Sequence, residues 1–566
     1  MALRFRPQLF RQFAVRQLPP SLYALLGVCI LGPLLRPGYI LTLDMVFTPH
    51  LRMPAGTLSN SYLWYAGLHW LNLIIPADWL QKLMLLAIFT MAGWGMHLLT
   101  RLLTGIVSRR SPAPYLAGLC FVANPFVYDR FMTGQYGVLA GYALLPWACR
   151  ALVVYTRQPG WRQLLAATAW MLALSIASIH SIVPMAILGM LVIGWHCWSR
   201  RRTPGAIWTV LRKSALVIAL WVVASSYWLI PLAQGKGSVA QALGSFAGGD
   251  RAAFSTVGGN VFERLANVGL LQGFWAEDRA LFVLPQAKAP AWTLLMFLLV
   301  ALAFTGIYLL WRQGRRGVAG LLLGSIVSGA FLAAGIGNSW MAAHIPLFNG
   351  YREPQKFAML VAFGYAPGIA VATAAGARWL KRNSRLPVTL PLFWVMVFLL
   401  PVLTASTLFW GARGQLQPTL YPDSWYSANQ LLNHDSANFK SLFLPWHLYM
   451  YTDFAGRIIA NPAPAFFDKP MIVSDDPELG QVAHTEADSL PRKTGEALAR
   501  GPHSDHQLGQ DLATLGIKYI VVANVSSDFL RYGYLARQSN ITPIAKYDTL
   551  LVYKNHAYTS ANNTGH

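Results

Sequence analysis

The sequence predicts a polytopic α-helical membrane protein with about eleven transmembrane helices and a C-terminal exocytoplasmic α/β domain. Of its 566 residues, 55% are hydrophobic and only 12% are charged, whereas soluble chains carry roughly 25% charged residues. The charge is also unevenly spread: residues 1–410 hold 33 basic and 8 acidic side chains, and residues 411–566 hold 12 and 14. We therefore expect a membrane domain over 1–410 and a soluble domain over 411–566.

Eleven apolar segments account for the membrane domain, since a spanning helix needs about 20 residues. They lie near residues 21–41, 80–103, 114–128, 135–155, 163–180, 181–198, 214–233, 291–311, 318–337, 357–378 and 387–410. The third segment is short, and the fifth and sixth could instead form a re-entrant pair around Ser178–Pro184. The stretch 58–75 is apolar but contains several polar residues, so we expect a helix lying at the membrane interface there.

Arginine and lysine fix the expected orientation. They gather in alternate connections: in the N-terminal segment and near residues 101–110, 157–162, 200–213, 312–316 and 378–385. Short basic loops stay in the cytoplasm, so we expect a cytoplasmic N-terminus and, after eleven crossings, an exocytoplasmic C-terminal domain. The net charge of +23 belongs largely to these loops and does not indicate a nucleic-acid partner.

The acidic residues of the membrane half all fall in the loops assigned to the outer side. They are Asp44, Asp78, Asp129, Asp250, Glu263, Glu277, Asp278 and Glu353. A proton-coupled transporter would more often keep carboxylates within its spans, because charges there are costly and retained for transport. This distribution favours chemistry at the outer face over transport.

The first outer loop, GYILTLDMVFTPHLRMP, carries the candidate catalytic residue Asp44. Its neighbours are aromatic and apolar, so partial desolvation should raise its pKa above about 3.9 and make it a better base. The alternative is an aspartate that merely caps a helix or orders a loop.

The second outer loop, NPFVYDRFMTGQYG, offers Asp129 and Arg130 as substrate-binding candidates. Asn124-Pro125 should break the third apolar segment, and Gly134 permits a close backbone approach. We expect Asp129 and Arg130 at the membrane surface beside aromatic side chains, where they could also simply pair with each other.

The third outer loop, FNGYREPQKF, resembles a phosphate-binding helix start. Pro354 suits the first helical position, with Glu353 near the cap and Lys356 in the first turn. Two cations, Arg352 and Lys356, beside a positive helix end are unfavourable unless an anion is near, and a phosphate would fit there. Alternatively, Arg352 pairs with Glu353 or reaches lipid headgroups.

Three further features complete the outer side. His180, in SIASIHSIVP, could contact substrate or hydrogen-bond a neighbouring helix. The outer loop 234–290, with Glu277, is too long for a mere connector. A divalent metal ion could bind the outer carboxylates, but no tight ligand spacing supports one.

After residue 410 the pattern changes to mixed α/β. DLATLGIKYIVVAN predicts a helix, a glycine stop at Gly516 and a buried strand over Ile517–Val522. TLLVYKN, SLFLPW and GRIIA predict further strands, and Ser474–His506 reads as a loop or disordered excursion. Nothing in this domain suggests catalysis; support or polymer binding is expected.

Together, the aspartate after the first span, the NPF–DR–GQ and YREPQKF loops and the terminal LGIKYIVV module resemble the GT-C superfamily of polytopic membrane glycosyltransferases. The likeness is to its large members, such as arabinofuranosyltransferase-like and YfhO-like proteins. It implies a cell-envelope enzyme of a bacterial or archaeal inner membrane. The enzyme would move a sugar from a polyprenyl-phosphate donor to a glycan, lipid or protein acceptor. The family's acidic first-loop residue falls on Asp44, and a cationic phosphate-binding role falls on Arg352.

Many members of that superfamily pair two acidic residues in the first loop, whereas Asp44 stands between Leu43 and Met45. This departure leaves metal dependence open. Other functions also stay open at this point: a lipid-linked glycan flippase, a glycan polymerase, or a non-catalytic cell-envelope assembly protein.

Overall fold

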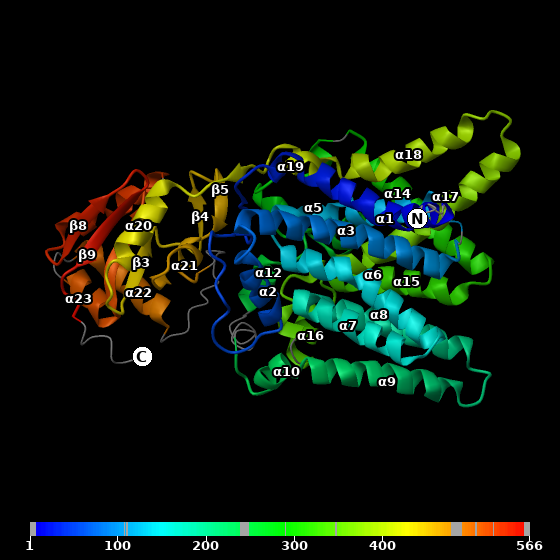
Figure 1. Cartoon of the computed structure of the whole chain (residues 1–566), viewed down its shortest axis with the longest axis horizontal. Helices are drawn as coiled ribbons and strands as arrows, with labels where there is room; N and C mark the ends of the chain where they lie inside the picture. Colours follow the sequence, from blue (N-terminus) through cyan, green and yellow to red (C-terminus); the bar gives the residue numbers. More distant parts are fainter. Residues whose placement is uncertain are drawn as a thin grey trace, which may run out of the picture.

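The computed structural model describes residues 7–106, 108, 111–237, 248–288, 290–345, 348–476, 489–503, 507–524 and 526–559. These residues form a bundle of long helices with a smaller domain containing a β-sheet at one end (Figure 1). Within them, eight helices are long and apolar enough to cross a membrane, and a bent pair of helices makes a ninth candidate.

The eight long helices are α1 (Pro7–Leu31), α3 (Ala77–Thr104), α6 (Tyr136–Arg157), α8 (Ile182–Ser199), α9 (Ala206–Ala224), α14 (Trp292–Arg312), α15 (Arg316–Ala333) and α17 (Ala358–Asn383). The bent pair is formed around α18 (Thr389–Thr404) and α19 (Phe409–Arg413), with an angle of 64° at the break. Two other expected segments are helical but short: α4 (Ala113–Val122) with 10 residues and α7 (Trp161–Ala177) with 17. All eleven apolar segments are therefore helical, although eight or nine pass as full-length spans.

The breaks between these helices follow local side-chain chemistry. Asn124 ends the α4 segment and starts α5 (Pro125–Met132), because its Oδ1 accepts a hydrogen bond from the Val127 backbone N–H at 3.1 Å. This confirms the break predicted at Asn124-Pro125. A short turn, η2 (Ile179–Ser181), separates α7 from α8. The polar-interrupted stretch 58–75 forms the short helix α2 (Tyr62–Asn72).

Helix α17 forms the centre of the bundle. The most apolar stretch of α17 is wholly buried inside the protein, whereas only 17% of the corresponding stretch of α9 is buried. It packs most extensively against α14 and α15. At its crossing with α14, a side-chain carbon on Gly306 would lie 1.8 Å from the carbonyl oxygen of Gly368. Small residues at this crossing let the two backbones approach closely.

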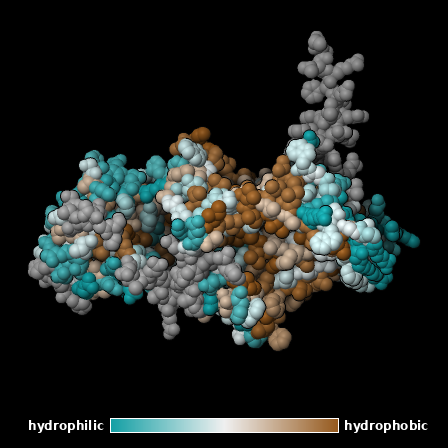
Figure 2. All heavy atoms as spheres, turned by 90° about the horizontal axis from the view of Figure 1, so that it is seen from below, coloured by the Kyte–Doolittle hydropathy of each residue, from teal (hydrophilic) through white to brown (hydrophobic). Residues whose placement is uncertain are grey.

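The outer surface of the bundle is apolar over a broad band. Figure 2 shows this band between the more hydrophilic C-terminal domain and a hydrophilic opposite end. Large apolar side chains on different helices contribute to it, among them Val223 on α9, Phe297 on α14 and Leu399 on α18, which are 70%, 57% and 46% exposed. Such a belt is what a bilayer requires of the helices that contact it.

The C-terminal domain is built on a five-stranded sheet in the order β6-β3-β7-β9-β8. The strands are β3 (Lys440–Leu444), β6 (Met471–Ile472), β7 (Ile517–Ala523), β8 (Ile541–Lys546) and β9 (Leu550–Asn555). Strand β3 runs parallel to β6 and β7, and β9 runs antiparallel to β7 and β8. The strands predicted from SLFLPW, IKYIVV and TLLVYKN are confirmed as β3, β7 and β9. GRIIA forms β5 (Arg457–Ala460), paired with β4 (Tyr449–Thr452) in a separate hairpin.

Four helices surround these strands: α20 (Asp423–Asn433), α21 (Ala463–Phe466), α22 (Leu490–Arg500) and α23 (Gln507–Thr514). The prediction of a loop over Ser474–His506 is wrong for α22. Ser489 caps that helix by accepting a hydrogen bond from the Arg492 backbone N–H at 3.3 Å, and a proline follows the cap. This serine–proline start is a signal that the sequence offered. Residues 477–488 and 504–506 lie outside the described residues.

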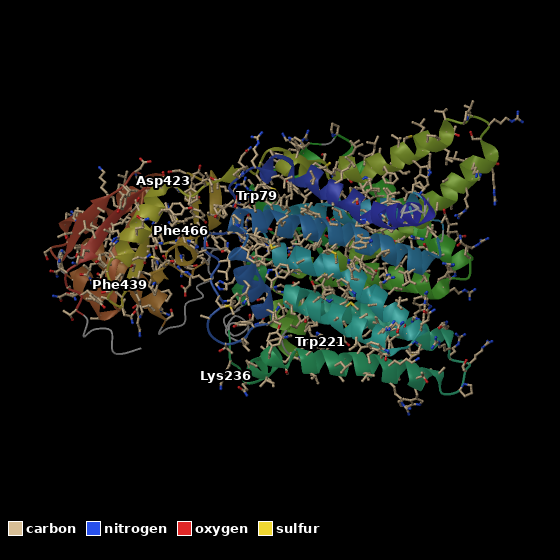
Figure 3. The ribbon with its side chains drawn as sticks, in the orientation of Figure 1. Trp79, Trp221, Lys236, Asp423, Phe439 and Phe466 are labelled. Atoms are coloured by element: carbon tan, nitrogen blue, oxygen red, sulfur yellow. The ribbon has the colours of Figure 1, made fainter. Side chains whose placement is uncertain are left out.

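The C-terminal domain is joined to the first outer loop. Strand β1 (Tyr39–Ile40) pairs antiparallel with β2 (Pro418–Thr419), and the Leu43 carbonyl accepts a hydrogen bond from Ala460 of the β4–β5 hairpin at 2.7 Å. Figure 3 shows Trp79, at the start of α3, and Lys236 at the end of the bundle that faces this domain. The first outer loop is therefore held between the bundle and the domain.

The close α14–α17 crossing predicts a specific sensitivity to side-chain size. Gly306→Val should lower the free energy of unfolding by about 2 kcal/mol or more, because overpacking a tight contact forces the helices apart. Thermal unfolding of the detergent-purified protein measures this. Gly320→Val on α15 is the matched control, because a side chain at Gly320 would meet open space. Equal unfolding temperatures for the two variants would contradict the proposed packing.

Candidate active site

A polar cavity of about 380 Å³ lies at the end of the bundle next to the C-terminal domain. Five separate segments surround it: the first outer loop, the start of α2, the turn between α5 and α6, the connection from α7 to α8, and the segment before α17. Its polar lining includes Asp44, Gln135, His180, Arg352, Glu353 and Lys356. Three predicted outer loops and His180 therefore meet in one hollow.

The position of Asp44 depends on a close approach between two loops. Its backbone N–H donates to the Thr133 carbonyl at 3.0 Å. The next residue, Gly134, has φ +71°, and a side chain there would lie 2.4 Å from the Met45 nitrogen. Only glycine meets both requirements without strain. The close backbone approach predicted at Gly134 is confirmed, and it brings Asp44 against the second loop.

Asp44 is a hydrogen-bonded carboxylate that opens into the cavity. The Tyr449 hydroxyl donates to its Oδ1 at 2.8 Å, and Gln135 Nε2 donates to its Oδ2 at 3.5 Å. Surrounding protein atoms raise the pKa of Asp44, the Tyr449 hydrogen bond partly opposes that shift, and the negative charge of Glu353 adds to it. The direction agrees with the upward shift expected from the sequence, and a carboxylate of raised pKa accepts a proton more readily.

Glu353 is the centre of a buried charge network. Its carboxylate bridges Arg130, at 2.9 Å from Nη1, and Lys356, at 3.3 Å from Nζ. Gln135 Nε2 also donates to Glu353 Oε2, at 3.2 Å. Burial alone would raise the pKa of Glu353, but Lys356 and Arg130 outweigh it and hold that pKa well below its usual range. The carboxylate therefore stays ionised and balances part of the positive charge around the cavity.

Lys356 also contacts His180. The two nitrogens, Nζ and Nε2, are 3.2 Å apart. Since an ammonium group only donates, His180 Nε2 is the acceptor, and the imidazole carries its hydrogen on Nδ1. The ring packs edge-on against Tyr351, with 5.7 Å between centroids. His180 thus lines the cavity and hydrogen-bonds a lysine of another segment, and its contact with a substrate stays a prediction.

Arg352 lies at the rim of the same cavity. Its guanidinium stacks over the Phe254 ring at 4.5 Å from the centroid, and its side chain is half-buried. Pro354 occupies the first position of the helical turn η6 (Pro354–Phe357), with Glu353 as its cap, so the helix start predicted from YREPQKF is confirmed. Two cations, Arg352 and Lys356, lie beside that helix start and line the cavity.

Asp129 and Arg130 are buried inside the protein, and their expected depth at the membrane surface stays a prediction. Asp129 is 3% exposed and Arg130 is 0% exposed, and neither is among the residues lining the cavity. The guanidinium of Arg130 lies over the Phe274 ring at 4.2 Å. Segment 248–288 supplies Phe274, and its Val283 carbonyl accepts a hydrogen bond from the Tyr128 hydroxyl of α5. Long-range packing of this kind leaves no local pattern in the sequence.

Asp129 lies beside another carboxyl group, that of Glu277. Burial raises its pKa, and the neighbouring Glu277 raises it further. Burial likewise raises the pKa of Glu277 to about 7, although backbone N–H groups of Gly273 and Phe274 oppose the shift. Glu277 thus hinders the ionisation of Asp129, whereas the hydrogen bond between them lowers the pKa of Glu277. This pair lies beneath the site and does not line it.

The side chains around Asp44 do not suit a divalent metal. In the described parts of the chain, no three His, Cys, Asp or Glu side chains are grouped closely enough to hold an ion. The hydrogen-bond partners of Asp44 are a tyrosine and a glutamine, whereas Mg²⁺ and Ca²⁺ prefer several carboxylate and carbonyl oxygens. The divalent metal that the sequence left open gains no support from these residues.

Two residues in contact with Asp44 were not predicted. Gln135 stood in the quoted GQYG motif, but nothing indicated that it would bridge Asp44 and Glu353. Tyr449 comes from the C-terminal domain, 405 residues further along the chain. Its contact arises from the docking of the β4–β5 hairpin on the first outer loop, which no local sequence pattern reveals.

Comparisons with known proteins bear on the fold. No protein-family profile matches the chain, and no curated protein sequence matches it. Among solved structures it is similar to the arabinofuranosyltransferase AftD from Mycobacteria, with a TM-score of 0.62 and 15% identity over 95% of this chain. This chain spans 39% of that structure's length.

Two further structures are similar at a TM-score of 0.48. ArnT from Cupriavidus metallidurans, bound to undecaprenyl phosphate, is 13% identical, covering 94% of this chain and 97% of its own. The oligosaccharyltransferase of Archaeoglobus fulgidus is 12% identical, covering 92% and 70%. The mycobacterial similarity extends over nearly the whole chain, membrane bundle and C-terminal domain together. The chain therefore has the GT-C fold of polytopic membrane glycosyltransferases.

Proposed function

We propose that this protein is a membrane glycosyltransferase that uses a polyprenyl-phosphate sugar as its donor. It transfers the sugar to a glycan, lipid or protein acceptor on the outer face of the plasma membrane. The observation that supports this most directly is the shared cavity: a carboxylate with a raised pKa, Asp44, and two cations, Arg352 and Lys356, line one hollow at the end of an apolar bundle. The GT-C fold adds to this support.

The cationic side of the cavity suits the donor phosphate. Arg352 presents a planar guanidinium, which binds phosphate oxygens in a bidentate manner. Lys356 and the start of the η6–α17 segment place further positive charge beside it. Glu353 forms ion pairs with Lys356 and Arg130 and so holds them in position. As a carboxylate, it does not bind the anion itself. His180, hydrogen-bonded to Lys356, fixes the direction of the ammonium group.

The part of the cavity around Asp44 suits the acceptor. In the proposed reaction, the acceptor hydroxyl oxygen attacks the anomeric carbon and forms the new glycosidic bond. Asp44 takes the hydroxyl proton, which is worth about 10²–10⁴-fold in rate for a positioned base. The bond from the anomeric carbon to the phosphate oxygen breaks, and Arg352 and Lys356 stabilise the departing phosphate. Displacement from the face opposite the leaving group inverts the anomeric centre.

One assay separates this proposal from the alternatives that the sequence left open. The purified protein, reconstituted in vesicles, is incubated with labelled polyprenyl-phosphate sugars and a mixture of glycan and lipid acceptors. Transfer of the label to an acceptor supports a transferase, and chain elongation indicates a polymerase. Movement of the intact lipid across the bilayer indicates a flippase. If neither a transfer product nor transport is detected, the result would indicate an assembly protein.

Asp44→Asn should lower the transfer rate by at least about 100-fold, because an amide cannot accept the proton. Folding should be unaffected, since the asparagine side chain can still accept the Tyr449 hydrogen bond. Single-turnover transfer and the thermal unfolding temperature are measured on the same preparation. An unchanged turnover would remove Asp44 from the mechanism.

Arg352→Ala should weaken use of the donor by about 10-fold or more, because a charge-assisted phosphate contact contributes about 1.5–3 kcal/mol. The apparent KM for the donor should rise, while the apparent KM for the acceptor should change little. Arg378→Ala, an exposed arginine at the far end of α17, is the control. Equal losses in both variants would argue against a phosphate site at Arg352.

Tyr449→Phe should shift the pH dependence of transfer. The Tyr449 hydrogen bond lowers the pKa of Asp44, so its removal raises that pKa. Asp44 must be deprotonated to act as a base, and the rise of activity with pH should therefore move to higher pH. Tyr451→Phe, on the same hairpin and 45% exposed, should leave the profile in place. A Tyr449→Phe profile that coincides with that of the unmodified protein would show that the contact does not tune the base.

A further inference from the structure

A second polar cavity, of about 580 Å³, lies at the opposite end of the bundle. The C-terminal ends of α3, α6 and α8 and the turn between α14 and α15 enclose it. The side chains that define its character are Arg157, Arg201, Arg315, Arg316, Trp195 and Trp198. We name this group the arginine pocket.

The arginine pocket is remote from the candidate active site. Helix α6 begins at Tyr136, which lines the first cavity, and ends at Arg157, which lines the second. Its 22 residues correspond to a length of about 33 Å. The two cavities therefore open at opposite faces of the membrane domain, and the arginine distribution places the second at the expected cytoplasmic face.

The pocket has an excess of positive charge that the described protein does not neutralise. No aspartate or glutamate is among its lining residues. None of its four arginines forms an ion pair with a carboxylate of the described residues. Several guanidinium groups around one hollow repel one another, so an external anion would stabilise the arrangement.

Packing and backbone contacts, rather than carboxylates, hold these arginines in place. Arg315 Nη1 donates to the Leu103 carbonyl at 3.2 Å. Its Nη2 lies where a side chain on Gly105 would be, 2.4 Å from the ideal Cβ position. Arg201 stacks over Trp198 at 4.0 Å and donates to its carbonyl at 2.9 Å. The guanidinium groups are thus positioned while their charge stays uncompensated.

The same packing brings an indole into the pocket wall. Arg157 lies over Trp195 at 5.1 Å from the ring centroid. A side chain on Gly317 would lie only 1.7 Å from Trp195 Cδ1, so glycine at this position is what lets the indole rest against the α15 backbone. The arginine pocket is consequently a built feature that depends on Gly105 and Gly317.

We propose that the arginine pocket binds the phosphate headgroup of an anionic phospholipid from the cytoplasmic leaflet. Guanidinium groups match phosphate oxygens in geometry and charge. The lining also includes Leu102, Leu103 and Val318, which suit the glycerol and upper acyl carbons. Trp198 is 64% exposed at the end of an apolar helix, a position typical of tryptophan at the headgroup level. A free phosphate would use the arginines but not these apolar neighbours.

Native mass spectrometry and thermal unfolding of the detergent-purified full chain test this assignment. Phosphatidylglycerol, phosphatidylcholine and inorganic phosphate are added separately. We expect phosphatidylglycerol to form adducts and raise the unfolding temperature, and the other two to have little effect. Arg157→Gln combined with Arg315→Gln should weaken phosphatidylglycerol binding at least tenfold.

Matched variants keep the test decisive. Arg378→Gln combined with Arg382→Gln removes the same charge from the exposed end of α17, outside the pocket, and should bind phosphatidylglycerol normally. If the pocket variant does not fold, Arg201→Gln combined with Arg316→Gln replaces it, because this pair leaves the Arg315–Leu103 and Arg157–Trp195 contacts in place. Equal loss in the control, equal binding of phosphatidylcholine, or full stabilisation by inorganic phosphate would each overturn the lipid assignment.

Discussion

The candidate site depends on one buried carboxylate. Glu353 is 5% exposed and joins Arg130 of α5 to Lys356 of the segment that starts α17. Removing one partner of a buried ion pair costs about 3–5 kcal/mol, because the remaining charge is left without compensation. Glu353 therefore ties the second outer loop to the third, and Gln135 extends that tie to Asp44 in the first. Three loops that are far apart in the sequence become one polar wall.

The C-terminal domain contributes to that wall. Its β2 strand pairs with β1 of the first outer loop, and Tyr449 of its β4–β5 hairpin donates to Asp44. The expectation that the domain serves only support or polymer binding is thus too narrow in structural terms. It contributes a hydrogen bond to the proposed base, and that hydrogen bond lowers the pKa of Asp44.

The cavities at the two ends of the bundle differ in the charges of their lining residues. At the end next to the C-terminal domain, carboxylates and cations are mixed: Asp44, Glu353, Arg352 and Lys356 line one cavity. In the proposed function, the cations bind a phosphate and Asp44 accepts a proton. At the opposite end, the arginine pocket offers cations without carboxylates. It therefore suits a permanent anionic ligand such as a headgroup, which is bound and not chemically changed.

The sequence by itself determined the periodic and compositional features. Apolar length identified the eleven helical segments, Asn124-Pro125 and Pro354 marked helix boundaries, and β7 followed from a buried apolar run after Gly516. These features are local, because hydrogen bonding and hydrophobic burial within one segment set them. The sequence also singled out Asp44 and Arg352, since charged residues beside apolar spans are few.

Tertiary structure alone decided which of those charges meet. Arg130 pairs with Glu353 and packs against Phe274 of segment 248–288, and Asp129 lies buried beside Glu277 instead of at the protein surface. Tyr449 reached Asp44 only because the C-terminal domain docks on the first outer loop. These outcomes depend on packing between segments hundreds of residues apart, and that packing is set by shape and by the pairing of buried charge, which no short stretch of sequence encodes.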